Sequence, residues 1–176
     1  MLFALSACVL SGAIWLIGKT HFEGRREAKL SGQVNEIVSL MGMPAAAPFD
    51  ATVDTVRIFI NDHSQTRIDD AFHAMRGNTS AFAAGIIAHA KDPKVERVHM
   101  ECSTRANLMT RILRQMGIET RMISIFRTRD DFSSHSFLDV YNPDVRKWQT
   151  VDPDYDLIGW RRQPARGCRS PKKRVI

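Results

Sequence analysis

The sequence contains few cysteines and no paired cysteine motif. Cys8, Cys102 and Cys168 are the three cysteines among 176 residues, too few and too far apart for the disulfide framework of a small secreted domain. Because no Cys-x-x-Cys pair occurs, a zinc ribbon and a thioredoxin-type redox site are excluded. The content of 44% apolar and 25% charged residues excludes collagen-like and wholly disordered chains, and the length suits one domain with a single core.

The excess of positive charge is confined to the C-terminal end. Residues 161–176 contain seven Lys or Arg and no acid, so the first 160 residues carry 18 basic and 19 acidic side chains. A basic domain surface is therefore not supported, and we expect no specific nucleic-acid partner. The segment itself has few apolar residues, and we expect a basic disordered tail. Two alternatives are that the tail binds anionic lipid or nucleic acid.

Charge is absent from residues 2–18, which as a helix would be about 26 Å long, slightly less than a hydrocarbon core of about 30 Å. The segment lacks the basic start and short apolar core of a signal peptide. We therefore predict that residues 1–20 are a membrane anchor or signal segment and that the protein is membrane-associated through a single N-terminal span. A cleaved signal and a buried N-terminus are the alternatives. The four basic residues between positions 19 and 29 favour a cytoplasmic domain, whereas a signal-like segment favours a periplasmic one.

Hydrophobic periodicity divides the remaining chain into helices followed by strands. Residues 21–48 are expected to form a polar helix and a linker, and residues 49–160 the domain. Helices are expected near residues 53–63, 68–75, 80–90 and 103–116, and strands over residues 119–128, 134–141 and 146–152. This order predicts the α+β class with a small antiparallel sheet.

Cys102 stands at the start of the predicted helix over residues 103–116. A thiol at that position lies beside unpaired backbone N–H groups and the positive end of the helix dipole, which predicts a lowered pKa and a reactive thiolate. The alternative is that Cys102 is a small buried residue.

His135 and Asp152 fall on the second and third predicted strands. A four-residue loop over residues 142–145 would pair Tyr141 with Arg146, and the same register would place His135 directly opposite Asp152. A carboxylate there would fix the imidazole tautomer. The sequence therefore predicts a Cys-His-Asp triad for acyl transfer, with Cys102 as nucleophile, His135 as base and acid, and Asp152 as orienting group. The alternative for Asp152, which precedes a proline, is that it only ends the strand.

Four segments in this order resemble the transglutaminase-like superfamily: Glu101-Cys102-Ser103, Met116–Arg121, His135–Tyr141 and Trp148–Pro153. The resemblance covers about residues 95–156 and implies a papain-like core with catalytic Cys102, His135 and Asp152. It also implies acyl transfer on an amide bond of a protein or peptide, by a peptidase, amidase or transglutaminase, with no metal or organic cofactor. The aromatic side chain of Phe137 has no N–H to donate, so the backbone N–H of Cys102 is the expected oxyanion donor.

Two further interpretations remain open. The first is a catalytically inactive transglutaminase-like module that acts as a binding partner or scaffold at the membrane. The second starts from His99 and Cys102, which form an H-x-x-C pair that could contribute to a metal site. No second paired motif supports that site, and we predict that the chain binds no metal.

Overall fold

The computed structural model describes residues 23–44, 46–126, 134–154 and 157–158. The helices cover residues 23–40, α2 (Phe49–Asp62), α3 (Asp70–Met75), α4 (Thr79–Lys91) and α5 (Cys102–Gln115). The strands are β1 (Ser64–Thr66), β2 (Val98–Met100), β3 (Thr120–Phe126), β4 (Ser134–Asn142), β5 (Lys147–Asp152) and β6 (Leu157–Ile158). Helices precede a small antiparallel sheet, which confirms the α+β class.

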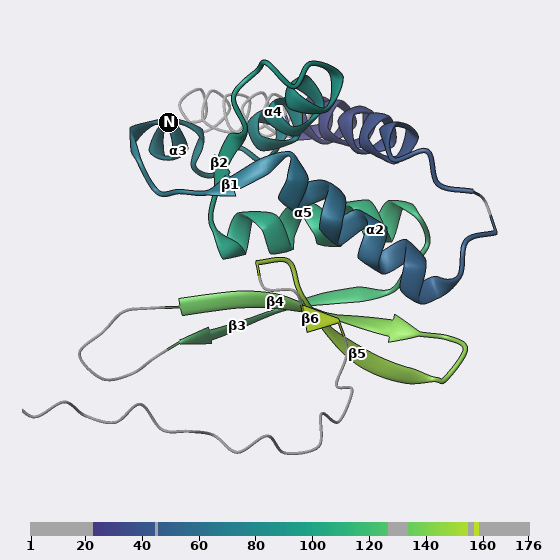
Figure 1. Ribbon diagram of the computed structural model, residues 1–176. Helices are drawn as coiled ribbons and strands as arrows, with labels where there is room; N and C mark the ends of the chain where they lie inside the picture. The colour runs from purple at the N-terminus through teal and green to yellow at the C-terminus, as the bar shows by residue number, and fades with distance from the viewer. Residues whose placement is uncertain (1–22, 45, 127–133, 155–156, 159–176) are drawn as a thin grey trace, which may run out of the picture.

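The main sheet has the strand order β3-β4-β5-β6, and every neighbouring pair in it is antiparallel. A second sheet consists of the parallel pair β1 and β2, which are distant in sequence. Figure 1 shows the helices gathered on one side of the main sheet, with α5 next to the strands. Because α5 contacts β3 and β4 as well as α2 and α4, it joins the helical layer to the sheet.

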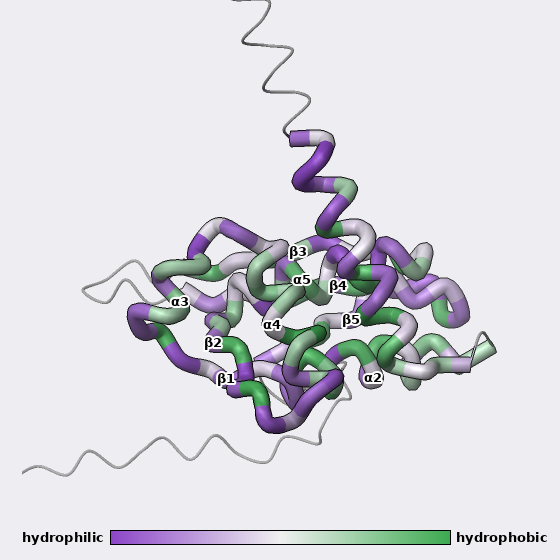
Figure 2. Tube along the Cα trace, turned by 90° about the horizontal axis from the view of Figure 1, so that it is seen from above, coloured by the Kyte–Doolittle hydropathy of each residue, from purple (hydrophilic) through white to green (hydrophobic). Residues whose placement is uncertain are grey.

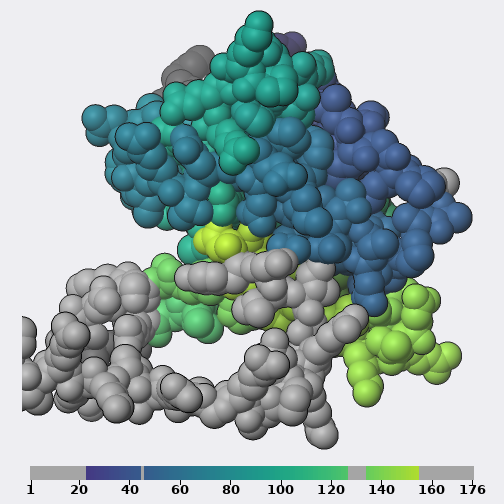
Figure 3. Space-filling model, in the orientation of Figure 1, coloured from purple at the N-terminus to yellow at the C-terminus, as the bar shows by residue number. Residues whose placement is uncertain are grey.

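The apolar face of α5 contributes more buried residues to the core cluster than any other described element. Leu108, Met109, Ile112 and Leu113 are completely buried, at the helical spacing that the sequence predicted. Leu138, Val140 and Val151 cover this face from β4 and β5. This packing holds α5 against the sheet. Figure 3 shows the helical layer and the sheet stacked against each other.

The helix over residues 23–40 belongs to the same core. Its residues Leu30, Val34 and Ile37 are buried and lie in one cluster with the side chains of α5. Figure 2 shows that the described start of this helix is mostly hydrophilic and projects from the body. The hydrophobic core therefore includes residues that precede position 49.

The β4–β5 hairpin differs from the predicted register by two residues. Tyr141 pairs with Trp148, and Asn142 with Lys147, instead of Tyr141 with Arg146. Arg146 has a positive φ of 52°, a left-handed conformation that suits the end of a loop and not a ladder position. The pairing prediction was therefore wrong by two residues. A shift of two leaves every side chain on its predicted face, because side chains in a strand alternate with period two.

The predicted membrane location requires correction. Across residues 23–44, 46–126, 134–154 and 157–158, no helix is both long enough and apolar enough to cross a bilayer. A single membrane span is therefore not supported. The hydrophobic helix expected within residues 1–20 and the tail over residues 161–176 lie outside the described residues.

Candidate functional site

Cys102 is the first residue of α5 and is half-buried. The chain reaches it from β2 through Glu101, whose extended backbone (φ −105°, ψ 171°) precedes the first helical turn. The Cys102 Sγ lies 3.9 Å from the carbonyl oxygen of Ser134, the first residue of β4. The sulfur therefore sits where the start of α5 meets the start of β4.

His135 and Asp152 are in direct contact. Nε2 of His135 lies 2.5 Å from Oδ2 of Asp152, at hydrogen-bonding distance. Leu138 pairs with Val151, so the same register continued by one pair places Asp152 opposite Phe137 and diagonal to His135. Diagonal neighbours on one face are within reach of long side chains, which explains why the contact survives the two-residue shift.

The Asp152 carboxylate is held on both oxygens. Only 6% of Asp152 is exposed, and its Oδ1 accepts a 2.9 Å hydrogen bond from the backbone N–H of Asp154. With Oδ2 next to the imidazole, this second bond fixes the orientation of the carboxylate. A carboxylate fixed in this way orients the ring and stabilises its protonated form.

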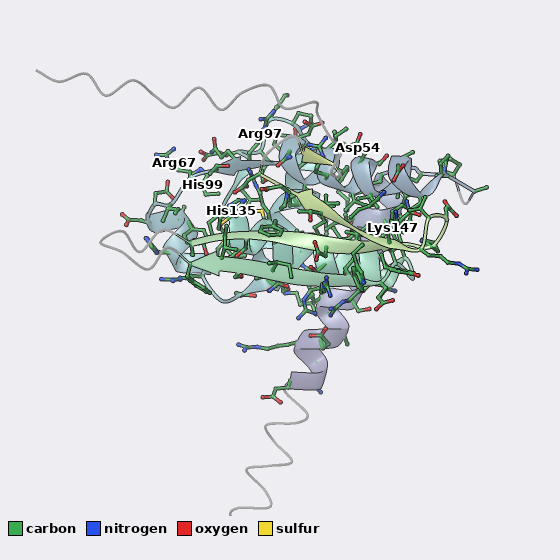
Figure 4. All side chains as sticks on the ribbon, turned by 90° about the horizontal axis from the view of Figure 1, so that it is seen from below. Asp54, Arg67, Arg97, His99, His135 and Lys147 are labelled. Atoms are coloured by element: carbon green, nitrogen blue, oxygen red, sulfur yellow. The ribbon has the colours of Figure 1, made fainter. Side chains whose placement is uncertain are left out.

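The nucleophile candidate and the histidine also converge. Cys102 Sγ, a ring nitrogen of His135 and a carboxylate oxygen of Asp154 all lie within 4.8 Å of one another. The structure thus brings Cys102, His135 and Asp152 from α5, β4 and β5 into one group, and Asp154 joins them. Figure 4 shows His135 near one end of the sheet, far from Lys147 at the hairpin end. The catalytic roles of the three residues stay predictions.

The electrostatic surroundings of Cys102 differ from the predicted ones. Burial raises the pKa of the Cys102 thiol, and the nearby carboxylates of Asp154 and Glu101 raise it further. Backbone N–H groups of Ser136 and Ser103 favour the thiolate and oppose this shift. The predicted lowering of the pKa was wrong, because desolvation at the α5–β4 junction outweighs the N–H groups at the helix start.

Sequence reasoning did not identify Arg105 and Asp154 as members of this group. Only 4% of Arg105 is exposed, and its Nη1 lies 2.7 Å from Oδ1 of Asp154. The same guanidinium donates to the hydroxyls of Ser64 at 3.1 Å and Thr66 at 2.8 Å on β1. The spacing in the sequence could have identified Arg105, because it follows Cys102 by three residues and residues three apart lie on one face of a helix.

His99 has partners other than Cys102. Its Nδ1 lies 2.8 Å from Oδ1 of Asp69, and its Nε2 lies 3.3 Å from Oε1 of Glu96. The group of potential metal ligands that includes Cys102 contains His135 and Asp154, and His99 is not in it. The H-x-x-C interpretation of His99 and Cys102 therefore finds no support in the described part of the chain.

Comparisons with known proteins agree with the geometry. No curated protein and no solved structure matches the chain. A family model matches from the end of α4 to the turn after β5, a segment that contains Cys102, His135 and Asp152. The resemblance predicted from the sequence is confirmed for that segment: over residues 92–153, the chain matches the Transglutaminase-like superfamily.

Proposed function

We propose that this protein is a cysteine-dependent enzyme that transfers the acyl group of an amide bond. The observation that carries the proposal is the 2.5 Å contact of His135 with Asp152, combined with the Cys102 sulfur within 4.8 Å of a His135 ring nitrogen. A thiol, an imidazole and an orienting carboxylate in this order are the components of nucleophilic acyl transfer.

In the first half of the reaction, His135 accepts the proton of the Cys102 thiol as the sulfur attacks the amide carbonyl. The tetrahedral intermediate collapses when His135 gives that proton to the leaving amine. The C–N bond breaks, and the acyl group remains on Cys102 as a thioester. Asp152 holds the imidazole and stabilises its positive charge throughout, which suits its short contact with Nε2.

In the second half, His135 accepts a proton from the incoming acceptor, which attacks the thioester. The C–S bond breaks, and the proton passes to the Cys102 sulfur. Water as acceptor makes the protein a peptidase or amidase, whereas an amine makes it a transglutaminase. The backbone N–H of Cys102, in the first turn of α5, is the proposed donor to the oxyanion in both halves.

The test uses the full chain with Cys8→Ser and Cys168→Ser, which leaves Cys102 as its sole thiol. We expect p-nitrophenyl acetate to acetylate Cys102, as seen by mass spectrometry, and the thioester then to hydrolyse. Replacing His135 by Ala should slow acylation by roughly 100-fold or more, because the general base is lost. His73→Ala, which removes an exposed histidine on α3, is the control and should leave the rate unchanged. Equal rates for both variants would refute the proposal.

A second candidate function is a transglutaminase-like module that binds partners without turnover. The observation in its favour is the raised pKa of Cys102, which reduces the thiolate population at neutral pH. This candidate predicts that acetylation of Cys102 is no faster than that of a simple thiol and that it is insensitive to His135→Ala.

A further inference from the structure

The group around Cys102 offers three ligand types that bind a thiophilic divalent cation. Its members are the Cys102 sulfur, a His135 ring nitrogen and an Asp154 carboxylate oxygen, all within 4.8 Å of one another. Zinc binds sulfur at about 2.3 Å and nitrogen or oxygen at about 2.0–2.2 Å, so its tetrahedral ligands lie about 3.5 Å apart. The three ligand atoms are at most 4.8 Å apart, so they need to approach one another by only about 1 Å to bind zinc.

The partners behind these ligands are already those that a metal site needs. Oδ2 of Asp152 accepts a hydrogen bond from Nε2 of His135 in the tautomer that carries its proton on Nε2. In this tautomer, the lone pair that can bind a metal is on Nδ1. A metal-bound histidine almost always donates its other N–H to a carboxylate in this way. Arg105 holds Oδ1 of Asp154, and the carboxylate has a second oxygen with which to bind an ion.

The charges in the group favour a divalent cation. With Cys102 as thiolate, Cys102, Asp152 and Asp154 carry three negative charges, the nearby carboxylate of Glu101 adds a fourth, and Arg105 supplies one positive charge. The resulting excess of negative charge attracts a divalent ion. A bound cation would also offset the electrostatic repulsion between the Cys102 thiolate and the Asp154 carboxylate.

The donor set distinguishes among metals. One sulfur, one nitrogen and one carboxylate oxygen suit Zn²⁺ or Co²⁺, whereas Mg²⁺ and Ca²⁺ require a shell of oxygen ligands. Three protein ligands leave the fourth tetrahedral position to water. The ion can reach the group from solvent, because Cys102 is half-buried and the His135 side chain is 27% exposed.

We propose that Cys102, His135 and Asp154 form a reversible zinc site that silences the Cys102 thiol. On binding, the Sγ–H proton is released to solvent and an Sγ–Zn bond forms. The metal then occupies the lone pairs of both the nucleophile and its base. The inference stands on the geometry of the ligands and does not require turnover, so it extends beyond the proposed function.

Cobalt spectroscopy tests the site directly. In the full chain with Cys8→Ser and Cys168→Ser, Co²⁺ should produce a near-ultraviolet thiolate-to-cobalt charge-transfer band, and Zn²⁺ should displace it. Cys102→Ser should abolish the band. Asp154→Asn, as loss of a ligand, and Asp152→Asn, as loss of the His135 partner, should each weaken Co²⁺ binding, the latter by about 10- to 100-fold. Asp70→Asn, which changes an exposed carboxylate of α3, is the matched control.

Protection from alkylation provides the second readout. Zn²⁺ should slow iodoacetamide labelling of Cys102 at least tenfold, and Mg²⁺ or Ca²⁺ at the same concentration should have no effect. A cobalt band that is absent, or that is equally strong in Asp154→Asn and Asp70→Asn, would overturn the zinc site. Because the band does not depend on acyl transfer, failure of the zinc site and failure of the proposed enzyme are distinguishable.

Discussion

At the scale of single residues, the surroundings of Cys102 have opposing effects on the pKa of its thiol. Burial and the carboxylates of Asp154 and Glu101 favour the neutral thiol, whereas the N–H groups of Ser136 and Ser103 favour the thiolate. A nucleophile with a raised pKa depends on its base more than a preformed thiolate does. In the proposed reaction, the His135–Asp152 pair is therefore more important than in a site with a stable thiolate.

Asp154→Asn should make Cys102 more reactive toward iodoacetamide near neutral pH. The carboxylate raises the thiol pKa, so its neutral replacement lowers that pKa and increases the thiolate fraction at a given pH. The measurement is the labelling rate against pH in the single-thiol chain. The midpoint should lie above that of a simple thiol in the parent and shift downward in Asp154→Asn. Asp70→Asn should leave the midpoint in place, and an upward shift in Asp154→Asn would contradict the assigned cause.

The types and order of the site residues could be predicted from sequence, but their surroundings could not. Cys102 before an apolar helix and His135 and Asp152 on successive strands were enough to identify the group. Desolvation of the Cys102 thiol depends on β4 lying against the start of α5, which no local pattern reveals. Arg105 is a charged residue of α5, yet it is buried because hydroxyls from β1 and a carboxylate after β5 surround it, and these partners are distant in sequence.

At the scale of elements, the longer helices and strands were predictable and the short strands were not. The helical period of α5 and the β-forming residues of β3, β4 and β5 placed these elements within a few residues of their observed bounds. β1 and β2 have three residues each and pair in parallel across more than 30 positions. Three residues are too few to establish a period, so only the long-range pairing defines them.

Gly85 of α4 is the residue that allows this helix to approach β2. A Cβ at position 85 would lie 2.8 Å from Cβ and 2.9 Å from Cγ2 of Val98, a stiff β-branched side chain. Gly85→Ala gains about 1 kcal/mol of helix propensity but costs about 1–3 kcal/mol by overpacking. We expect a net destabilisation of up to about 2 kcal/mol in urea unfolding, relieved only in part in the double variant with Val98→Ala, which removes Cγ2 but keeps the Val98 Cβ.

Gly32→Ala is the control for this prediction. Position 32 lies in the helix over residues 23–40, and a Cβ there would have no neighbour within 4 Å among the described atoms. The substitution should therefore stabilise the protein by about 1 kcal/mol through helix propensity alone. Equal effects of Gly85→Ala and Gly32→Ala would show that the close approach of α4 to β2 does not limit position 85.

At the scale of the whole molecule, a buried ion pair joins the helical layer to the end of the sheet. The guanidinium of Arg105 on α5 binds β1 through Ser64 and Thr66, and it binds the turn after β5 through Asp154. This network therefore couples the position of Cys102 at the start of α5 to the position of the Asp152–Asp154 turn.

Replacing Arg105 should destabilise the protein more than breaking an ion pair on the surface does. The Arg105 and Asp154 side chains are 5% and 13% exposed, so Arg105→Met leaves a buried carboxylate without its partner, at a cost of about 3–5 kcal/mol. Adding Asp154→Asn should recover part of this loss, because the uncompensated charge is gone, with a coupling energy of about 1–3 kcal/mol in urea unfolding. Lys91→Met breaks the exposed pair with Glu36, whose side chains are 57% and 40% exposed, and should cost at most about 1 kcal/mol. If the effects of Arg105→Met and Asp154→Asn were simply additive, the ion pair between Arg105 and Asp154 would contribute nothing to holding the two layers together.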